Sequence, residues 1–223
     1  MNLSKVKIIQ RPTSTTFYSN FFRTFFPNEL QLVEVKKDHC LFEEYKPAIH
    51  VYILESGIFK ISKNGFDRPV LVSIECGDKI LNSWDSDCNC VTRGESLGAC
   101  RILKISKLVF EEALQKHREL QKHYISSLLE SLAFHQKRQA RLSSLDARNR
   151  MIHLLLDFSQ QLQVGSLAPL PLPLSRSDYA DLIGTTVETT VRILKSLCED
   201  GLISVRAKEI TLLKIEGLKQ CLR

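Results

Sequence analysis

The spacing of apolar residues changes in character along the chain, and its first part has the pattern of β-structure. From about Leu30 to Ser106, short apolar runs alternate with turn signals such as Asn64-Gly65 and Gly77-Asp78. Runs of strand length between such breakers predict antiparallel strands joined by hairpins, as in a sandwich or a roll. The predicted strands are Gln31 to Lys36, Val51 to Leu54, Gly57 to Ser62, Val70 to Glu75 and Arg101 to Ile105.

A helical period follows the predicted strands. Between Phe110 and about Leu145 there is neither proline nor glycine, and residues at steps of four and three form a seam typical of a coiled coil. Ile125, Leu129 and Leu132 form a second apolar line around the same helix. One seam can face the helix's own domain while the other faces a second subunit, so we predict that this helix forms a dimer. The alternative is a helix that packs only within its own chain. The predicted dimerisation residues are Tyr124, Leu128, Ser131, His135 and Leu142, and Arg138 lies on the same seam.

Two short helices with a tight turn between them are predicted near the C-terminus. A helix from Arg148 to Leu162 comes first, and an extended connector follows it because the prolines between 169 and 173 cannot be helical. Ser175 is a good N-cap for a helix over Arg176 to Ile183, with Asp178 in a box-like position. Gly184 supplies the left-handed conformation that a tight turn needs.

The second of these helices, Val187 to about Glu199, has the residue types that read DNA bases. Thr185 or Thr186 caps it, and Gly201 ends it. Arginine can bind guanine through two hydrogen bonds, and glutamate can accept from cytosine. The predicted base-reading residues, all on the exposed N-terminal surface of this helix, are Glu188, Thr189 and Arg192.

A β-hairpin is predicted behind the two helices. Its strands, Leu202 to Val205 and Ile210 to Leu213, flank a turn whose basic residues can meet phosphates. The predicted DNA-backbone contacts are Ser175, Arg176, Thr186, Lys195, Arg206 and Lys208. Helix, turn, helix and hairpin together predict a winged DNA-binding domain; the alternative is a helical scaffold in which Glu188 and Arg192 form only a surface pair.

These motifs occur in a recognisable order. They are Glu55-Ser56-Gly57-Ile58, Glu75-Cys76-Gly77-Asp78, Leu103-Lys104-Ile105-Ser106, Leu145-Asp146-Ala147-Arg148 and, most specific, Leu174 to Gly184 followed by Thr186 to Arg192. With these motifs in this order and spacing, the chain resembles the CRP/FNR family of bacterial transcription regulators over nearly its whole length. The family's base-reading Glu and Arg correspond to Glu188 and Arg192. Val187 stands where the cAMP-receptor branch has an Arg, so the helix is more similar to the FNR-like branch.

The resemblance implies an α+β fold with three parts. These are an N-terminal antiparallel β-roll, jelly-roll-like and similar to cyclic-nucleotide-binding domains, over residues 1–108, a long dimerisation helix over 109–145, and a winged helix-turn-helix over 146–223. It also implies a homodimer that binds a palindromic promoter site in double-stranded DNA, with RNA polymerase as a candidate partner. Ala207 stands where the family's wing often has Gly, so we expect the turn of the wing to differ from the turn usual in the family.

The segment from Lys79 to Cys90 departs from the cAMP-binding members. Those members have a Gly-Glu pair for the ribose and an Arg-Ser pair for the phosphate after the Gly-Asp turn, and this segment lacks both. A bound nucleotide would be left with unpaired polar atoms. We therefore predict that cAMP is not the ligand, and the sequence predicts no other cofactor.

Composition narrows the class of protein further. The net charge of the whole chain is +6, but the part from residue 146 onward has ten Lys/Arg and nine Asp/Glu, so its charge is nearly balanced. A DNA-binding role therefore depends on where individual basic residues lie. No signal peptide or membrane span is recognisable, which predicts a cytoplasmic protein without a membrane partner. No catalytic motif is recognisable, so we expect no enzyme. A sensory β-roll acting through protein contacts is the competing function.

Seven cysteines without a secretion signal argue against a disulfide framework. Four of them lie close together within the predicted β-roll, between residues 76 and 100, at Cys76, Cys88, Cys90 and Cys100. A redox or metal sensor built on these four is an alternative, but the Cys-x-Cys spacing is tighter than standard zinc or iron–sulfur sites. We expect Cys76 and Cys100 to be core residues on strands, with Cys88 and Cys90 in a loop.

Overall fold

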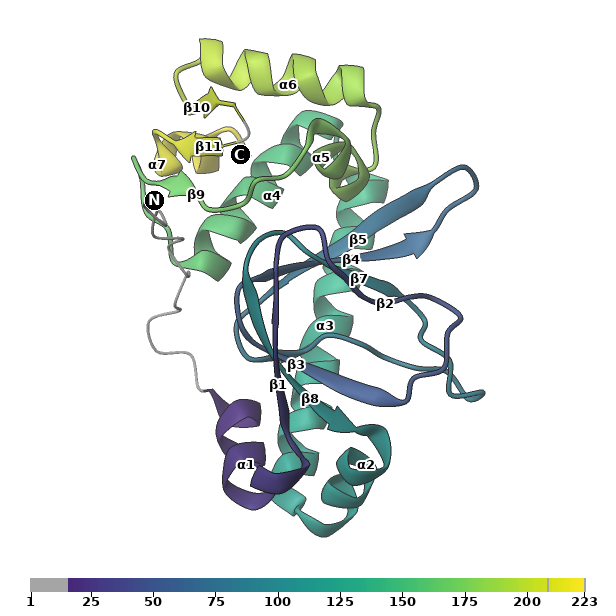
Figure 1. Ribbon diagram of the computed structural model, residues 1–223. Helices are drawn as coiled ribbons and strands as arrows, with labels where there is room; N and C mark the ends of the chain where they lie inside the picture. Colours follow the sequence, from purple (N-terminus) through teal and green to yellow (C-terminus); the bar gives the residue numbers. More distant parts are fainter. Residues whose placement is uncertain (1–15, 208, 223) are drawn as a thin grey trace, which may run out of the picture. The chain divides into compact units, whose positions relative to one another are not determined.

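A computed structural model describes residues 16–207 and 209–222, and Figure 1 shows its helices and strands. The chain divides into two compact units, of which the first ends at Leu129 and the second begins at Glu130. This boundary lies inside the helix α3 (Arg118–Ser144). The first unit contains the β-roll, and the second contains the helix-turn-helix.

The β-roll consists of two four-stranded antiparallel sheets, in the order β1-β8-β3-β6 and β2-β7-β4-β5. The predicted strands are confirmed as β1 (Gln31–Val35), β3 (His50–Ser56), β4 (Ile58–Asn64), β5 (Pro69–Cys76) and β8 (Cys100–Ser106). Three further strands were not predicted: β2 (Cys40–Phe42), β6 (Lys79–Ile80) and β7 (Arg93–Ser96). They are too short to produce a readable alternation of apolar and polar residues.

One apolar cluster fills the space between the two sheets. Leu54 and Ile102 contribute from one sheet, and Phe42 and Phe59 contribute from the other. Successive side chains of a strand point to opposite faces, so β3 and β8 also supply a second cluster on their other face. The helices α1 (Phe17–Phe25) and α2 (Lys107–Lys116) pack there, together with the start of α3. A single turn, η1 (Pro27–Glu29), connects α1 to β1.

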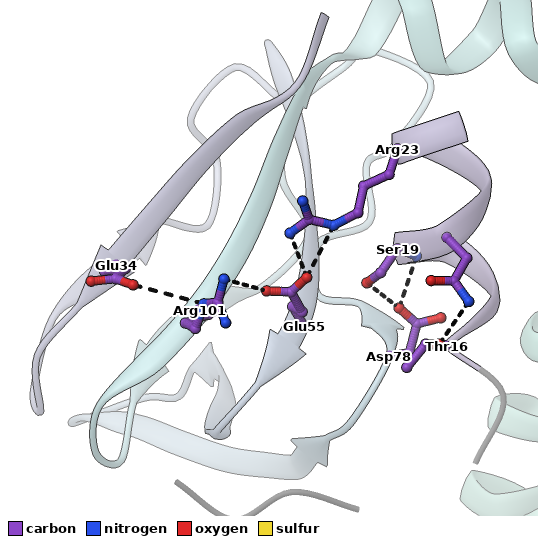
Figure 2. A network of polar contacts seen from close by, with 8 residues as sticks. Thr16, Ser19, Arg23, Glu34, Glu55, Asp78 and Arg101 are labelled. Carbon is purple, nitrogen blue, oxygen red and sulfur yellow. Dashed lines mark hydrogen bonds and ion pairs between the residues drawn. The ribbon is translucent and has the colours of Figure 1, made fainter. Parts of the chain in front are cut away.

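A carboxylate far away in sequence caps the N-terminus of α1. Thr16, the residue before this helix, makes no side-chain cap. Asp78 takes that place: its Oδ2 accepts from the Tyr18 N–H at 2.6 Å, and its Oδ1 accepts from the Ser19 N–H at 3.0 Å and the Ser19 hydroxyl at 2.6 Å. Figure 2 shows Asp78 beside Ser19. Burial raises the pKa of Asp78, and the hydrogen bonds from Ser19 and Tyr18 partly offset that rise. Asp78 therefore fixes α1 to the turn after β5.

Ion pairs attach the same helix to the roll. Glu55 of β3 lies between two arginines, at 2.6 Å from Arg23 of α1 and 3.3 Å from Arg101 of β8 (Figure 2). Arg101 also lies 3.7 Å from Glu34 on β1. Because these groups are partly exposed, each pair contributes little to stability, and their main effect is to orient α1.

The prediction of one continuous helix from Phe110 to Leu145 is wrong. α2 ends at Lys116, α3 begins at Arg118, and His117 between them has an extended backbone. The His117 ring lies edge-on to Phe21 and also contacts Phe25 and Phe26. Since no proline or glycine marks this position, the break arises from packing against α1.

The second unit contains the end of α3 and the predicted winged helix-turn-helix. Its further helices are α4 (Ala147–Leu162), α5 (Arg176–Ile183), α6 (Val187–Glu199) and α7 (Ile215–Gln220). A three-stranded sheet has the order β10-β11-β9, with β10 (Ile203–Arg206), β11 (Glu209–Leu212) and β9 (Pro169–Leu170). The connector is extended as predicted, and its leucines Leu170, Leu172 and Leu174 are buried. Pro169 is tolerated because it begins an edge strand.

Candidate nucleic-acid interface

Local capping and turn residues form the first part of the helix-turn-helix. The Ser175 hydroxyl accepts from the Asp178 N–H at 3.1 Å, and Asp178 Oδ2 accepts from the Ser175 N–H at 2.7 Å, a complete capping box. Gly184 follows α5 with φ of +63°, the left-handed conformation that the sequence predicted. A Cβ at this position would lie 2.7 Å from the end of the Leu142 side chain of α3, which can move aside, so the left-handed φ is the main reason for glycine here.

Two arginines from other helices hold the turn between α5 and α6. We call Arg138 of α3 and Arg150 of α4 the arginine clamp. Arg138 donates to the carbonyl oxygens of Leu182 and Asp181, both at 3.0 Å, and Arg150 donates to those of Ile183 at 2.7 Å and Gly184 at 3.2 Å. They lie at the end of α5 and in the turn after it, where backbone carbonyls lack the full set of helical partners. The Asp181 carbonyl also accepts from the Gly184 N–H at 3.3 Å. Burial lowers the pKa of Arg138, while the nearby Asp181 raises it.

The arginine clamp was missed from sequence, where Arg138 was placed on the dimerisation seam. A charged residue in an apolar seam was the available signal that this position has a partner within the chain. The clamp is reinforced by Arg141, which pairs with Asp157 of α4. These contacts fix the orientation of the helix-turn-helix relative to the end of α3 in this unit.

α6 has one buried face and one exposed face, as predicted. Ile193, Leu194 and Leu197 are buried, while Glu188 and Arg192 are exposed. Thr189 is half-buried, and its hydroxyl accepts from Arg192 Nη2 at 3.3 Å. The guanidinium is therefore held toward the N-terminal end of the helix, near Glu188, and the predicted base-reading residues lie together on one exposed surface.

The N-terminus of α6 favours negative charge at Glu188. Thr186 is the N-cap, and its hydroxyl accepts from the Thr189 N–H at 3.2 Å. The pKa of Glu188 is lowered by a hydrogen bond from its own N–H, by the Thr186 side chain and by the charge of Arg192. Glu188 is therefore ionised at neutral pH and can act as a hydrogen-bond acceptor.

The predicted DNA-backbone residues differ in their surroundings. Thr186, Lys195 and Arg206 are exposed, whereas Ser175 and Arg176 are half-buried, and the Ser175 hydroxyl is occupied by its capping box. Lys208 lies outside the described residues. Its neighbour Ala207 has φ of +53° in the hairpin turn, where glycine would be without strain.

A buried tyrosine in α5 gives a stability prediction. Tyr179 is fully buried, and among the described residues its hydroxyl has no hydrogen-bond partner. Burial raises the pKa of its phenol above the usual value. We expect Tyr179→Phe to raise the free energy of unfolding by about 1 kcal/mol, because it removes an unpaired polar atom. Urea denaturation followed by circular dichroism measures this change.

The matched control is Tyr18→Phe in α1. Tyr18 is also buried, but its hydroxyl lies 2.9 Å from Ser127 Oγ, so its loss should lower the free energy of unfolding by about 1 kcal/mol. Equal destabilisation by the two substitutions would contradict the assignment of an unpaired hydroxyl to Tyr179.

The predicted dimerisation residues divide into exposed and partly buried positions. Leu128, Ser131, His135 and Leu142 are exposed on α3. Tyr124 is half-buried, and its ring lies edge-on to Phe110 within the same chain. The second apolar line, consisting of Ile125, Leu129 and Leu132, is also exposed.

The four cysteines between residues 76 and 100 differ in burial and in the part of the fold that holds them. Cys76 and Cys100 are buried on strands, Cys88 is exposed in a loop, and Cys90 in the same loop is buried. Within residues 16–207 and 209–222, no group of three or more His, Cys, Asp and Glu side chains is placed to hold a metal ion. The same described residues include no helix long and apolar enough to cross a membrane.

The fold and the exposed face of α6 define a winged helix-turn-helix protein with an N-terminal β-roll. Residues 149–221 match the Crp-like helix-turn-helix domain. The nitrogen fixation regulation protein FixK of Azorhizobium caulinodans is 25% identical over 182 residues, which cover 78% of this chain and 71% of FixK.

Solved structures share the fold. FixK2 from Bradyrhizobium japonicum superposes with a TM-score of 0.76 at 20% identity, covering 86% of this chain and 96% of that one. A CRP/FNR family transcriptional regulator from Thermus thermophilus superposes with a TM-score of 0.71 at 18% identity, covering 86% of this chain and 98% of that one. Residues 149–221 are therefore a Crp-like helix-turn-helix domain, and the chain is similar in sequence to FixK and in fold to CRP/FNR transcription regulators.

Proposed function

We propose that this protein is a homodimeric transcription regulator that inserts α6 of each subunit into the major groove of a palindromic DNA site. The observation that carries the proposal is the exposed surface of α6, where Glu188 and Arg192 lie beside a capped helix N-terminus. The helix-turn-helix that presents them is held by the arginine clamp. A rigid support of this kind keeps base-reading side chains in register with the groove.

Lys195 and Arg206 are the proposed phosphate contacts, since both are exposed and basic. Neutralising phosphates releases counterions, so the affinity for DNA should fall steeply as salt rises. Gel-shift titrations with randomised DNA, followed by selection and sequencing, test the proposal. Recovery of a palindromic sequence supports it, while a dimer without salt-dependent DNA affinity would favour a module that acts through protein contacts.

The second subunit is proposed to cover the exposed apolar residues of α3. Leu128, Leu129 and Leu132 expose 49%, 59% and 53% of their surfaces in the single chain. Three large apolar side chains exposed within five positions of one helix are better accommodated in a helix–helix interface than in water. We propose that the two copies pair along this helix and act together on transcription in the cytoplasm, with RNA polymerase as the further partner.

Leu128→Asp is expected to convert the dimer into a monomer, because it places a charge in the interface, and to weaken binding to a palindromic site at least tenfold. Light scattering after size exclusion measures the first effect, and gel shift measures the second. The control is Leu108→Asp on α2, which is 72% exposed and lies outside α3. A dimer that survives Leu128→Asp with its DNA affinity intact would place the interface elsewhere.

We also propose that cAMP does not regulate this protein. The segment from Lys79 to Cys90 lacks the ribose-binding and phosphate-binding pairs of the cAMP-responsive branch. In their place, the side chain of Asn82 is buried and bonded to backbone groups of β3. Addition of cAMP should therefore leave the gel-shift titration unchanged, and a tighter complex in its presence would show this proposal to be wrong.

A further inference from the structure

A cavity of about 210 Å³ opens in the first unit beside the loop that follows β2. Its deep part is formed by Phe42, Ala48 and Cys90, all of which are buried. The half-buried side chains of His50 and Tyr52, from β3, form one wall. We infer that this cavity is a binding site for a small uncharged aromatic compound with one hydroxyl or N–H group.

The size of the cavity sets the size of the ligand. An apolar cavity of about 150 Å³ in a protein interior accommodates benzene. A cavity of about 210 Å³ therefore has room for one aromatic ring with a short substituent, or for two fused rings. A nucleotide is too large to be enclosed by it.

The cavity is lined by aromatic rings. The rings of Phe42 and Tyr52 are stacked, with centroids 5.8 Å apart and planes 13° apart. The His50 ring is tilted, with its centroid 6.2 Å from that of Tyr52. Aromatic ligands pack favourably against such rings by stacking and edge-to-face contacts, which adds to the gain from burial of their apolar surface.

The polar groups of the wall are uncharged at neutral pH. Burial raises the pKa of the Tyr52 phenol and of the Cys90 thiol. Burial also lowers the pKa of His50, and the charge of Lys104 lowers it further. A fully charged ligand would therefore find no buried counter-ion, while a hydroxyl or N–H group can hydrogen-bond to the phenol or the imidazole. The charged lining residues, Glu43 and Lys46, are of opposite sign and exposed.

A buried amide holds the wall in position before any ligand arrives. Asn82 is only 3% exposed; its Oδ1 accepts from the Tyr52 N–H at 3.0 Å, and its Nδ2 donates to the His50 carbonyl at 2.8 Å. Asn82 also hydrogen-bonds to the Cys90 side chain. A site that is already ordered loses less conformational entropy on binding. Asn82 lies in the segment from Lys79 to Cys90, which lacks the nucleotide-binding pairs. In this chain the same segment instead supports the wall of the cavity beside β3.

Isothermal titration calorimetry of the full chain, without DNA, tests the inference with phenol and indole as probes and benzoate as an anionic counterpart. We expect saturable binding of phenol or indole, one per chain, with a dissociation constant below about 1 mM. Benzoate should bind at least tenfold more weakly. Tyr52→Phe should weaken phenol binding about two- to tenfold, the effect of one lost hydrogen bond. Tyr45→Phe, in the adjacent loop and exposed, is the matched control and should leave binding unchanged.

Ala48→Leu provides a second variant because it fills the deep part of the cavity, and it should abolish binding. Its unfolding temperature shows whether the fold is kept; if it is not, Tyr52→Phe decides the test alone. The inference is overturned if neither probe binds, if benzoate binds as well as phenol, or if Tyr52→Phe binds phenol as well as the wild type does. Because the titration contains no DNA, its outcome is separate from that of the proposed DNA binding.

Discussion

Replacing Arg138 with alanine is expected to lower the free energy of unfolding of the second unit by about 2 to 4 kcal/mol, because two carbonyl groups lose their charged donor together. The carbonyls are those of Asp181 and Leu182 at the end of α5, each 3.0 Å from the guanidinium. Leu182 is 5% exposed, so water can replace the lost donor only poorly. Urea denaturation of the full chain measures the loss.

Arg138→Lys separates charge from geometry. Lysine keeps the positive charge but cannot reach both carbonyls with a planar fork, so we expect it to restore only part of the stability. The neighbouring Lys137→Ala is the matched control, since Lys137 is exposed on the same helix. If Arg138→Ala unfolded at the same urea concentration as Lys137→Ala, the arginine clamp would have no structural role.

Replacing Arg192 with alanine is expected to cost about 1 to 3 kcal/mol of binding free energy in each half-site and to relax specificity at one base pair. The guanidinium is exposed on α6, and its hydrogen bond to Thr189 is a local contact, so the substitution should leave folding unchanged. Gel-shift competition between the selected site and sites with single base changes measures both effects.

The controls for Arg192 are Lys195→Ala and Arg206→Ala. Both residues are exposed, and the proposal gives them phosphate contacts, so their loss should weaken all sequences alike and reduce the slope of affinity against salt. Full sequence preference in Arg192→Ala would show that Arg192 does not read a base. A loss of preference in Lys195→Ala would give that residue a base contact instead of a phosphate contact.

The helix-turn-helix was predicted nearly residue by residue because its signals are local. Ser175 and Asp178 form a cap from neighbouring positions, and Gly184 adopts its left-handed conformation directly after α5. The bounds of α5 and α6 agree with the prediction. The five longer strands were predicted to within two residues at each end. In contrast, β6 has only two residues and forms because β3 offers it partners.

Whether Glu188, Thr189 and Arg192 read bases stays a prediction, but their placement follows from the period of α6. Residues at steps of three and four share a face of a helix, so a buried stripe at Ile193 and Leu197 leaves Glu188 and Arg192 outside. Arg138, by contrast, makes contacts that the local sequence does not predict. Its place on a seam was readable, but its partners lie 43 and 44 residues away and no local pattern indicates them.

Local sequence therefore specifies where helices and strands begin and end, since caps, turn residues and hydrophobic periods act over a few neighbouring positions. Contacts between distant residues are specified by packing instead. Aromatic residues of α1 interrupt the helix at His117, and Asp78 caps a helix about 60 residues earlier in the chain. The arginine clamp and the aromatic cavity arise in the same way, because each needs side chains that come together only when the chain has folded.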